Sequence, residues 1–547
     1  MIHNIVTMCN GMAGASGSVS VQEFTRVCDR VDAEAEAALS GVFAQHRSWV
    51  MAMAYVAALC RDDVPVKTCW DLSQAAGLTR PRPFQSLIGE NEWDHHRLWD
   101  GIAGWASRVL TCPAADRLGP GIAVDETAQA KRGTHTAGVG VQYAGFAGAT
   151  INCVTSVVAS LVTPGASTWV ANDLFLQEKQ WFTGDGDKGL ARRRAAGIDE
   201  AVAFASKPQI ARRELAHLRE LGVAFTWAAG DEVYGRSSAL RKDHEDHHEA
   251  YAYFVPRDFH FPLPGGTSVR ADEVLQHADG HFEERSCGPG LNGPRWYQWA
   301  MLATASPEHF LLVRRAADTP TEPATPTPAA ASSDDHHHGA VSDPHTADLP
   351  PGTGFMYCYV PAGGPIAPTL ANLVLMVGRR WPVEETIAAA KGPIGWDDNQ
   401  FRTYTSVERH AALCGLAMLR VVAIRAGLEE QANGPTQTLT GPPSSTEGPT
   451  AEPDTQARAR HPDETRIPIA DAATPCHPDQ PCPAHLGWIR LSLAETLRLI
   501  NVMTAHISAA GKQFLLDWST WRREHQAIAR WYHRRARLAL TTAGSHP

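Results

Sequence analysis

Runs of small and β-branched apolar residues recur in the first half of the chain and predict a set of β-strands. Residues 121–127 combine Ile, Ala and Val, residues 138–146 alternate apolar and polar positions, and residues 150–163 are rich in Val. Such patterns are typical of buried or half-buried strands. A helical pattern at 210–221 precedes a further apolar run at 223–230. The order of three strands, a helix and another strand predicts a mixed α/β domain.

The first and the last of these strands each lead into acidic residues. Asp125 and Glu126 follow the run GIAV, and Asp231 follows the run VAFTWAAG. A carboxylate beside an apolar run is costly unless water, a hydrogen bond or a cation satisfies it. We therefore expect one site built from two chain segments, with a divalent metal ion as the neutralising group. The alternative, that each Asp only starts a turn or caps a helix, stays open.

A helical pattern precedes the strands, from about residue 39 to residue 110. Within it, residues 67–76 and 81–88 read as two helices joined by a tight turn, with Thr79 as the cap of the second. This spacing is similar to a helix-turn-helix, in which the second helix enters the DNA major groove. Arg80 and Arg82 stand at the entry of that helix. Plain helix packing would produce the same pattern and remains an alternative.

Composition restricts the class of protein. An apolar fraction of 44% and a charged fraction of 20% are typical of a globular protein. The 11 cysteines are scattered singly, which is not the framework of a small secreted domain, so a cytoplasmic location is expected. No run of 18 or more apolar residues predicts a membrane span. The net charge of −10 restricts any DNA contact to local basic patches, such as residues 522–537 with six Arg and one Glu.

The stretch RWPVEETIAAAK, residues 380–391, predicts a helix with Pro382 in its first turn. Arg380, Glu384 and Lys391 are four and seven residues apart and would project from the same side. They would form either an exposed salt-bridge ladder or a functional group. In the functional interpretation Glu384 binds a metal ion, and the two cations hold a phosphate chain, Arg as a bidentate fork and Lys as a point charge.

These residues resemble a known family. Asp125, Asp231 and Glu384 occur in the order of the Asp-Asp-Glu (DDE) triad of bacterial insertion-sequence transposases. Arg380-x3-Glu384-x6-Lys391 matches the signature Tyr-x2-Arg-x3-Glu-x6-Lys of one large group, except that Val377 replaces the Tyr. Further likeness lies in DET, KRG and GVQYAG within 125–145, in AAGDEVYG at 228–235, in YTSVERH at 404–410, and in the regions that flank them.

The resemblance implies a fold and an activity. The fold would be an RNase H-like core, a mixed sheet flanked by helices, with an insertion between the second Asp and the Glu. Asp125, Asp231 and Glu384 would bind two Mg²⁺ or Mn²⁺ ions, with Arg380 and Lys391 holding the DNA strand. Partners would be double-stranded DNA, as terminal inverted repeats and target, and a second copy of the chain. The expected DNA-binding residues are Arg80, Arg82, Lys131, Arg380, Lys391, Arg522, Arg523, Arg530 and Arg534.

The patterns together predict the following organisation of the chain. A flexible leader, 1–38, precedes a helical and possible DNA-binding domain, 39–112. The core occupies 113–235 and 352–428 and is interrupted by an insertion, 236–351, whose residues 317–351 are of low complexity. A Pro-rich linker, 429–483, precedes a basic helical region, 484–547.

Two other functions compete with this interpretation. His244 and His248 spell H-E-x-x-H, the pattern of zinc hydrolases, although no third ligand is evident. A second zinc site is conceivable at Cys476, Cys482 and His485. A catalytically inactive DNA-binding protein derived from a transposase would also carry the same motifs. Glycine-rich nucleotide-binding loops are absent from the sequence, which argues against a nucleotide-dependent enzyme.

Overall fold

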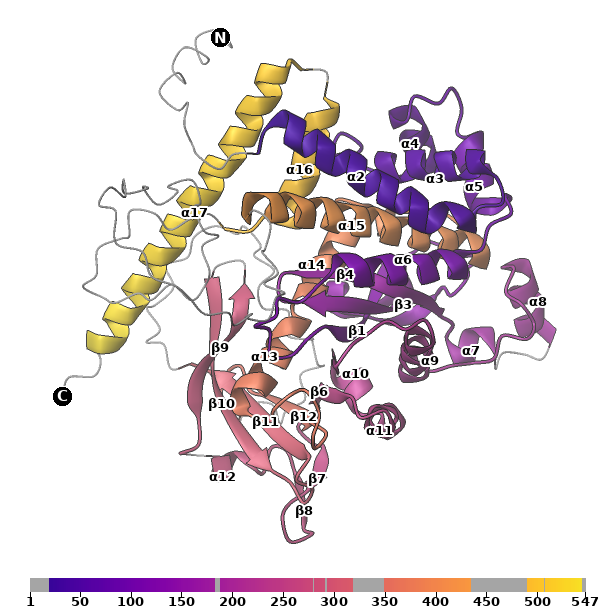
Figure 1. Cartoon of the computed structure of the whole chain (residues 1–547). Helices are drawn as coiled ribbons and strands as arrows, with labels where there is room; N and C mark the ends of the chain where they lie inside the picture. The colour runs from indigo at the N-terminus through magenta and orange to yellow at the C-terminus, as the bar shows by residue number, and fades with distance from the viewer. Residues whose placement is uncertain are drawn as a thin grey trace, which may run out of the picture. The chain divides into compact units, whose positions relative to one another are not determined.

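The structure is a computed structural model that describes residues 19–182, 187–278, 280–290, 293–317, 349–433, 489–505 and 507–543 (Figure 1). The chain divides into two compact units, one of residues 30–423 and one of residues 1–29 with 424–547. Each unit is described on its own. The first contains a ten-stranded mixed sheet flanked by helices, and the described part of the second is helical.

The centre of the large sheet has the strand order of an RNase H-like fold. Strand β1 (Gly121–Ala130) lies between β3 (Ala149–Thr163), which is antiparallel to it, and β5 (Trp227–Gly230), which is parallel. Outside these, β4 (Ala166–Phe175) pairs antiparallel with β3, and β6 (Ala250–Val255) pairs parallel with β5. The order β4-β3-β1-β5-β6 confirms the predicted α/β, RNase H-like fold class.

Two features of these strands differ from the sequence expectations. Strand β4 was not predicted, although Pro164 and Gly165 form the tight turn that folds it back on β3. Strand β1 does not end at the acidic pair, because β3 pairs with it along its whole length, from Gly121 to Ala130. Asp125 therefore lies in the middle of β1. The short strand β2 (Gly140–Ala144) pairs with the first residues of β3.

The segment predicted as an insertion extends the same sheet instead of forming a separate layer. Strand β12 (Gly354–Tyr359) pairs antiparallel with β6, and β11 (His309–Ala316), β10 (Gly293–Ala303) and β9 (Glu283–Gly290) follow in order (Figure 1). Because β6 is the fifth strand of the core, the boundary predicted at residue 236 is wrong. A small sheet and a short helix complete this region: β7 (His260–Pro262), β8 (Ser268–Arg270) and α12 (Leu275–Ala278).

Helices cover the sheet and bury its apolar side chains. Helix α9 (Lys207–Glu220) packs on β3 and β4, and α13 (Leu370–Arg380) packs on β5, β6 and β9. The approach of α13 to β9 requires Gly378, because a Cβ there would lie 1.6 Å from the Cys287 carbonyl oxygen. The remaining helices of this part are α7 (Glu178–Trp181), α8 (Asp187–Ala195), α10 (Glu232–Gly235), α11 (Ser238–Asp246), α14 (Pro382–Lys391) and α15 (Tyr404–Asn433).

Five helices precede the sheet: α2 (Val21–Leu39), α3 (His46–Leu59), α4 (Cys69–Ala75), α5 (Arg82–Gly89) and α6 (His95–Val109). The flexible leader predicted for 1–38 is wrong from Val21 onward, because α2 buries Val31, Ala35 and Leu39 at helical spacing. The predicted helix pair exists as α4 and α5. Its caps differ from the prediction, since Thr68 caps α4 and Pro81, not Thr79, precedes α5.

The second unit contains α16 (Leu493–Thr504) and α17 (Ala509–Ala543), which include the predicted basic helical tail. The low-complexity predictions for 317–351 and 429–483 fall mostly outside the described residues, except that α15 continues to Asn433. Cys476, Cys482 and His485 also lie outside them.

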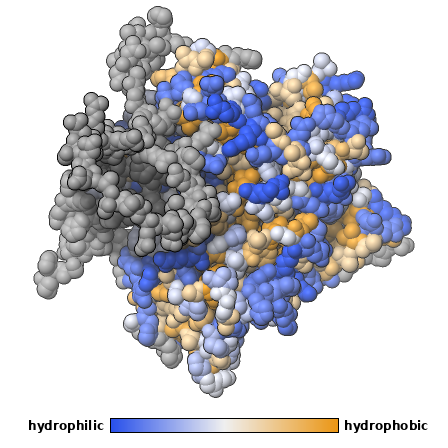
Figure 2. Space-filling view, in the orientation of Figure 1, coloured by the Kyte–Doolittle hydropathy of each residue, from blue (hydrophilic) through white to orange (hydrophobic). Residues whose placement is uncertain are grey.

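Helix α15 was not predicted, and it is long and apolar enough to cross a membrane by length and composition. However, 89% of its most apolar window is buried inside the protein, as in a core helix. On the face drawn in Figure 2, hydrophobic residues form patches among hydrophilic ones.

Candidate active site

Asp125 and Asp231 meet because two parallel strands bring them to the same level of the sheet. The register pairs Gly121 with Trp227 and Ala123 with Ala229. If the same register is continued for two more residues, Asp125 lies beside Asp231, which follows the last residue of β5. Because β5 stops at Gly230, this edge of β1 is open from there on. Two carboxylates at adjacent strand positions are the predicted metal-binding pair, and the sheet topology alone places them together.

Glu126 completes a cluster of three carboxylates. Asp125, Glu126 and Asp231 each offer an oxygen within 4.8 Å of the other two. Asp231 also caps α10, because its Oδ1 accepts a hydrogen bond of 2.9 Å from the Val233 amide. The alternative that Asp231 caps a helix is therefore correct, but this hydrogen bond does not exclude a metal-binding role for Asp231. Three converging carboxylates fit a hard divalent cation such as Mg²⁺ or Mn²⁺, which prefers oxygen ligands.

Glu126 is held from the side of α9 and α10. The Lys207 ammonium lies 2.6 Å from Glu126 Oε1, and the Tyr234 hydroxyl donates to Oε2 over 3.2 Å. Burial raises the pKa of Tyr234 well above its ordinary value, and the charges of Glu126, Asp231 and Asp125 raise it further. Tyr234 therefore stays a hydrogen-bond donor at neutral pH, pointing at the acidic cluster.

Arg380 is the cation at the centre of the site. Its Nη2 donates to Asp125 Oδ2 over 2.8 Å, and its Nη1 donates to Glu384 Oε1 over 3.3 Å. Burial lowers the pKa of this guanidinium, but the charges of Asp125, Glu384 and Asp231 outweigh burial and leave the pKa raised. Arg380 thus remains charged while it is 8% exposed. One buried cation is shared between the acids of β1 and of α14.

Proline divides the predicted helix 380–391 into two. Pro382 has no N–H, so it cannot donate to the Gly378 carbonyl as a continuous helix would require. That carbonyl instead accepts hydrogen bonds from Arg295 Nη2 (3.0 Å) and from the Trp381 amide (3.3 Å). The Arg295 guanidinium also lies over the Trp381 ring, 4.5 Å from its centroid. Arg295 on β10 therefore braces the joint that sets the direction of Arg380 and Glu384.

Arg380 links Glu384 to the cluster. Glu384 is not one of the three carboxylates that lie within 4.8 Å of one another, and its side chain is 41% exposed. The structure thus brings Asp125 and Asp231 together as predicted and adds Glu126. Glu384 contacts the Arg380 guanidinium, which lies between it and Asp125. The role of Glu384 as a metal ligand stays a prediction.

Lys391 lies at the end of α14, near the same acids. Its Nζ is 4.6 Å from the centroid of the Phe146 ring. Burial lowers the pKa of Lys391, opposed by the charges of Asp397, Cys153 and Asp125. Because the charge of Asp125 affects the pKa of Lys391, the Lys391 ammonium interacts electrostatically with the cluster. The break at Trp381 separates the helix of Lys391 from the helix of Arg380.

The other residues expected to bind DNA differ in availability. Arg80 is exposed, whereas Arg82 pairs with Glu90 over 2.8 Å. Lys131 donates to the Asn399 carbonyl over 2.6 Å, and burial lowers its pKa to about 8.

In the second unit, Arg522 pairs with Glu495 (3.1 Å) and Arg523 donates to the Ile489 carbonyl (2.7 Å). Arg530 and Arg534 are half-buried on α17. Lys131 and Arg523 thus have structural partners.

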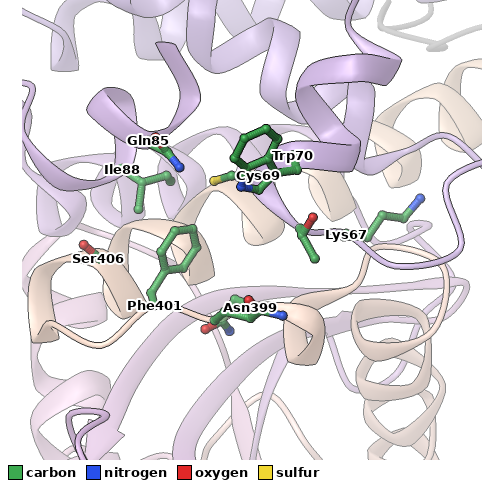
Figure 3. A pocket seen from close by; sticks show the side chains of 10 residues that line it. Lys67, Cys69, Trp70, Gln85, Ile88, Asn399, Phe401 and Ser406 are labelled. Carbon is green, nitrogen blue, oxygen red and sulfur yellow. The ribbon is translucent and has the colours of Figure 1, made fainter. Parts of the chain in front are cut away.

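A separate cavity of about 300 Å³ lies between the helix pair α4–α5 and the segment that leads into α15 (Figure 3). Trp70, Gln85 and Ile88 face Asn399 and Phe401 across it. None of its lining residues belongs to the acidic cluster. It is therefore distinct from the candidate active site, although Lys131 contacts its wall through Asn399.

The zinc-hydrolase pattern does not form a zinc site. His244 is fully buried, with Nδ1 2.8 Å from Glu249 and Nε2 2.9 Å from the Tyr253 hydroxyl. Both ring nitrogens thus have protein partners. Helix α11 ends at Asp246, and His248 has a φ of 53°, so the two His residues do not share a helix face as H-E-x-x-H requires.

Three site residues were missed in the sequence: Glu126, Lys207 and Tyr234. Glu126 carried a signal, since it follows Asp125 directly, but neighbouring residues of a strand point to opposite faces, so the pattern did not predict that both reach one cluster. Lys207 and Tyr234 carried no signal, because their contacts with Glu126 span 81 and 108 residues.

Comparison with known proteins adds one finding. Residues 38–277 match a family model described as DDE superfamily endonuclease. The match includes Asp125, Glu126, Lys207 and Asp231, and it ends before Arg380, Glu384 and Lys391. No curated protein matches the chain.

Proposed function

We propose, from the premise that residues 38–277 belong to the DDE superfamily endonucleases, that the protein is a DNA transposase of an insertion sequence. Membership of this family supports a nuclease in general. The further step, cutting and joining DNA at the ends of a mobile element, rests on one observation. Arg380 binds Asp125 and Glu384 at once, so all three acids predicted for the triad belong to one neighbourhood.

The acidic cluster fits divalent metal ions. Asp125, Glu126 and Asp231 would hold them, with Glu384 added from α14. When bound, Mg²⁺ or Mn²⁺ supplies Lewis acidity and a nucleophile activated at neutral pH for phosphodiester cleavage. A donor set of carboxylates without a neighbouring Cys or His in the cluster favours these ions over zinc.

The basic side chains would position the DNA. Arg380 uses one nitrogen for Asp125 and the other for Glu384, and a single phosphate could accept hydrogen bonds from both nitrogens at once. If Arg380 exchanged one of its carboxylate partners for a DNA phosphate, it would hold the DNA strand at the cluster. The released carboxylate could then bind a metal ion. Lys391, near Asp125, would add a point charge beside the phosphate chain and offset charge that develops during cleavage. No side chain needs to form a covalent bond to DNA.

The proposed partners are double-stranded DNA, as the terminal repeats of the element and its target, and a second copy of the chain, in the cytoplasm. Arg80 is exposed at the entry of α5 and is available for DNA. Because phosphate contacts release counterions, DNA affinity should fall steeply as salt rises.

A nicking assay tests the proposal. The substrate is linear DNA with the sequences that flank the gene, incubated with Mg²⁺, Mn²⁺ or a chelator. Asp231→Asn removes one charge from the cluster and should abolish nicking, as should Glu384→Gln. Lys391→Ala should lose less, because it positions phosphate. Gel-shift affinity for the same DNA should persist in Asp231→Asn and Glu384→Gln.

Glu220→Gln is the matched control, since Glu220 is 78% exposed at its side chain and ends α9, about 20 Å along the helix from Lys207, which contacts Glu126. It should nick like the parent. If Asp231→Asn and Glu384→Gln nick as fast as Glu220→Gln, these acids are structural and the nuclease interpretation is wrong. If the parent binds these ends but never nicks them, the protein is an inactive DNA-binding descendant of a transposase.

A further inference from the structure

The hairpin formed by β2 and the start of β3 exposes a group of large apolar side chains. Val141, Tyr143 and Phe146 are 58%, 41% and 53% exposed and lie within the span 141–146. Phe146 belongs to the short 3-10 helix Gly145–Ala147, which joins the two strands. A single exposed apolar side chain needs no explanation, but a group of them marks an interaction surface. These three residues form the hairpin tip.

Two residues of the hairpin tip lie on the face of the sheet that carries Asp125. Strand β3 sets Val158 opposite Asp125 on β1. The same strand sets Asn152 opposite Val141 on β2. Alternate residues of a strand point to the same face, and positions 152 and 158 are separated by an even number of residues. Val141, and Tyr143 two residues later, therefore project from the same face of the sheet as Asp125.

Phe146 connects the hairpin tip to the candidate active site through Lys391. The Lys391 Nζ lies over the Phe146 ring, 4.6 Å from its centroid. The charge of Asp125 acts on the same ammonium. Because Phe146 is more than half exposed, Lys391 covers one side of the ring and leaves the other side accessible. The ring thus orients the ammonium and still offers a flat apolar surface beside it.

The surroundings of the hairpin tip contain cations and no acids in the sequence. Residues 127–172 include no Asp or Glu, although the net charge of the chain is −10. Arg132 is exposed in the segment between β1 and β2 and forms no ion pair within the described parts of the chain. Asn152 holds that segment, because its Nδ2 donates to the carbonyls of Lys131 and Gly133, both over 2.8 Å. Aromatic rings beside cations suit an anionic ligand with flat apolar faces, as a nucleic acid strand is.

We propose that the hairpin tip is a platform on which the last base of a DNA strand stacks, while Lys391 binds a phosphate of the same strand. The proposal rests on the proposed function, because it places this base at the end that the acidic cluster cuts. Inside a duplex, neighbouring bases cover both faces of each base, so a protein ring can stack only on a terminal or unpaired base. Stacking tolerates any sequence, since every base has such a face. The platform therefore recognises a DNA end and not its sequence.

An acidic peptide or an anionic membrane would also suit cations beside apolar side chains. Neither accounts for the position of Phe146, whose ring lies on the cation that interacts with Asp125. A ligand on this ring stands next to the metal-binding acids, and DNA is the substrate of the proposed reaction. DNA is therefore the occupant that fits both the platform and the cluster.

Photocross-linking locates the terminal base. The full chain, with a chelator present, is mixed with DNA duplexes that carry 5-iodouracil either as the unpaired last base of one strand or at an internal paired position. On irradiation this base forms covalent bonds to aromatic rings that stack on it. Mass spectrometry should find a cross-link at Phe146 for the terminal position and little for the internal one. Phe146→Leu should remove it, whereas Phe146→Tyr, which keeps a ring, should still cross-link.

Affinity gives a second readout. Phe146→Leu should weaken binding of DNA with an unpaired last base by roughly tenfold, as expected for the loss of one stacked base. Binding of covalently closed circular DNA, which has no end, should not change. Val50→Ala is the control, because Val50 is a similarly exposed apolar residue on α3. It should resemble the parent in both measurements.

The outcomes separate this platform from the nuclease itself. A parent that binds the DNA but cross-links elsewhere overturns the platform, as does unchanged cross-linking or affinity in Phe146→Leu. Binding of an acidic peptide or of anionic lipid vesicles that depends on Phe146, without a cross-link to DNA, overturns it too. Because cross-linking needs no cleavage, a parent that cross-links at Phe146 but never nicks contradicts the transposase alone. Nicking without the cross-link contradicts the platform alone, and a parent that binds no DNA contradicts both.

Discussion

Two groups of carboxylates flank the same part of the sheet, and they differ in the cations around them. In the middle of β1, just beyond the end of β5, Asp125 faces the buried Arg380 and Glu126 faces Lys207. Between α9, β4 and α15, Glu214 and Glu408 are both buried. The guanidinium whose charge acts on both acids, that of Arg213, pairs with Asp173 and is 58% exposed at its side chain.

The difference decides which acids are ionised. Burial raises the pKa of Glu214 well above its ordinary value, and the charge of Asp173 adds to the shift. Burial also raises the pKa of Glu408, although the Leu174 amide and the Asn172 side chain donate hydrogen bonds to it. Burial thus favours the neutral form of both acids over the ionised form. A metal ion could take the place of the buried Arg380 cation beside Asp125, whereas Glu214 and Glu408 carry no negative charge to neutralise when they are protonated.

The largest expected effect comes from Arg380→Ala. Removing the cation leaves Asp125 and Glu384 without it, and breaking a buried pair from one side costs about 3–5 kcal/mol. Without divalent ions the free energy of unfolding should fall by this amount, and Mg²⁺ should restore much of it. Urea denaturation with chelator or with Mg²⁺ measures both.

Arg379→Ala is the matched control for that experiment, because Arg379 is equally buried but pairs with Asp116. It should lose stability without any rescue by Mg²⁺. Equal rescue of both variants would mean that Arg380 does not stand at the metal site.

A smaller effect of opposite sign is expected from Glu214→Gln. Gln keeps the size of Glu214 and leaves the same two atoms without hydrogen-bond partners among the described residues, but it carries no charge that burial must suppress. Each unit by which the pKa is raised is worth about 1.4 kcal/mol. Since the folded pKa is raised, the parent loses stability as pH rises above the ordinary value of 4.5. The variant should gain stability at neutral pH, and the gain should vanish below that value.

Denaturation across pH, with Glu220→Gln as the exposed control on α9, checks this prediction. A Glu214→Gln variant that is less stable than the parent at neutral pH would show that Glu214 is ionised and holds an undetected cation. That result would remove the distinction between the two groups of acids.

The smallest effect is expected from Lys207→Met. Lys207 and Glu126 are 19% and 23% exposed at their side chains, so solvent screens their pair and its loss should cost about 0.5–1 kcal/mol. Added salt should shrink the difference from the parent. Denaturation at low and high salt measures this. A loss as large as that of Arg380→Ala would mean that Lys207, not Arg380, is the main cation of the site.

Much of the sheet could be predicted from local patterns. The alternation and Val-rich runs located β1, β2 and β3, and a Pro-led Ala run located α14. Strand β4 was missed, because residues 166–175 become a strand by pairing with the long β3, and that pairing cannot be seen in the pattern of residues 166–175 alone. Helix α2 was missed because a Gly- and Ser-rich start disguised the helical stripe that follows it.

The candidate site divides in the same way. Asp125, Asp231, Arg380 and Glu384 were recognisable from motif order, since a family signature preserves residue types and spacing. The sequence did not reveal three features of the site. Asp125 lies in mid-strand, Glu126 reaches the cluster, and Glu384 is connected to the cluster through the Arg380 guanidinium. Each depends on where β5 stops and on the break that Pro382 makes before Glu384.

The sequence by itself determined the periodicities, the chemical types at the site and the basic run on α17, because each is a property of residues within a few turns or strand positions of one another. Tertiary structure alone decided which acids share a cation and which are neutral. The charge state of a carboxylate depends on burial and on groups brought near it by pairing, and those groups lie 255 residues away for Asp125 and Arg380. The parallel register of β1 and β5, set by long-range hydrogen bonds, is what turns two separate Asp residues into one site.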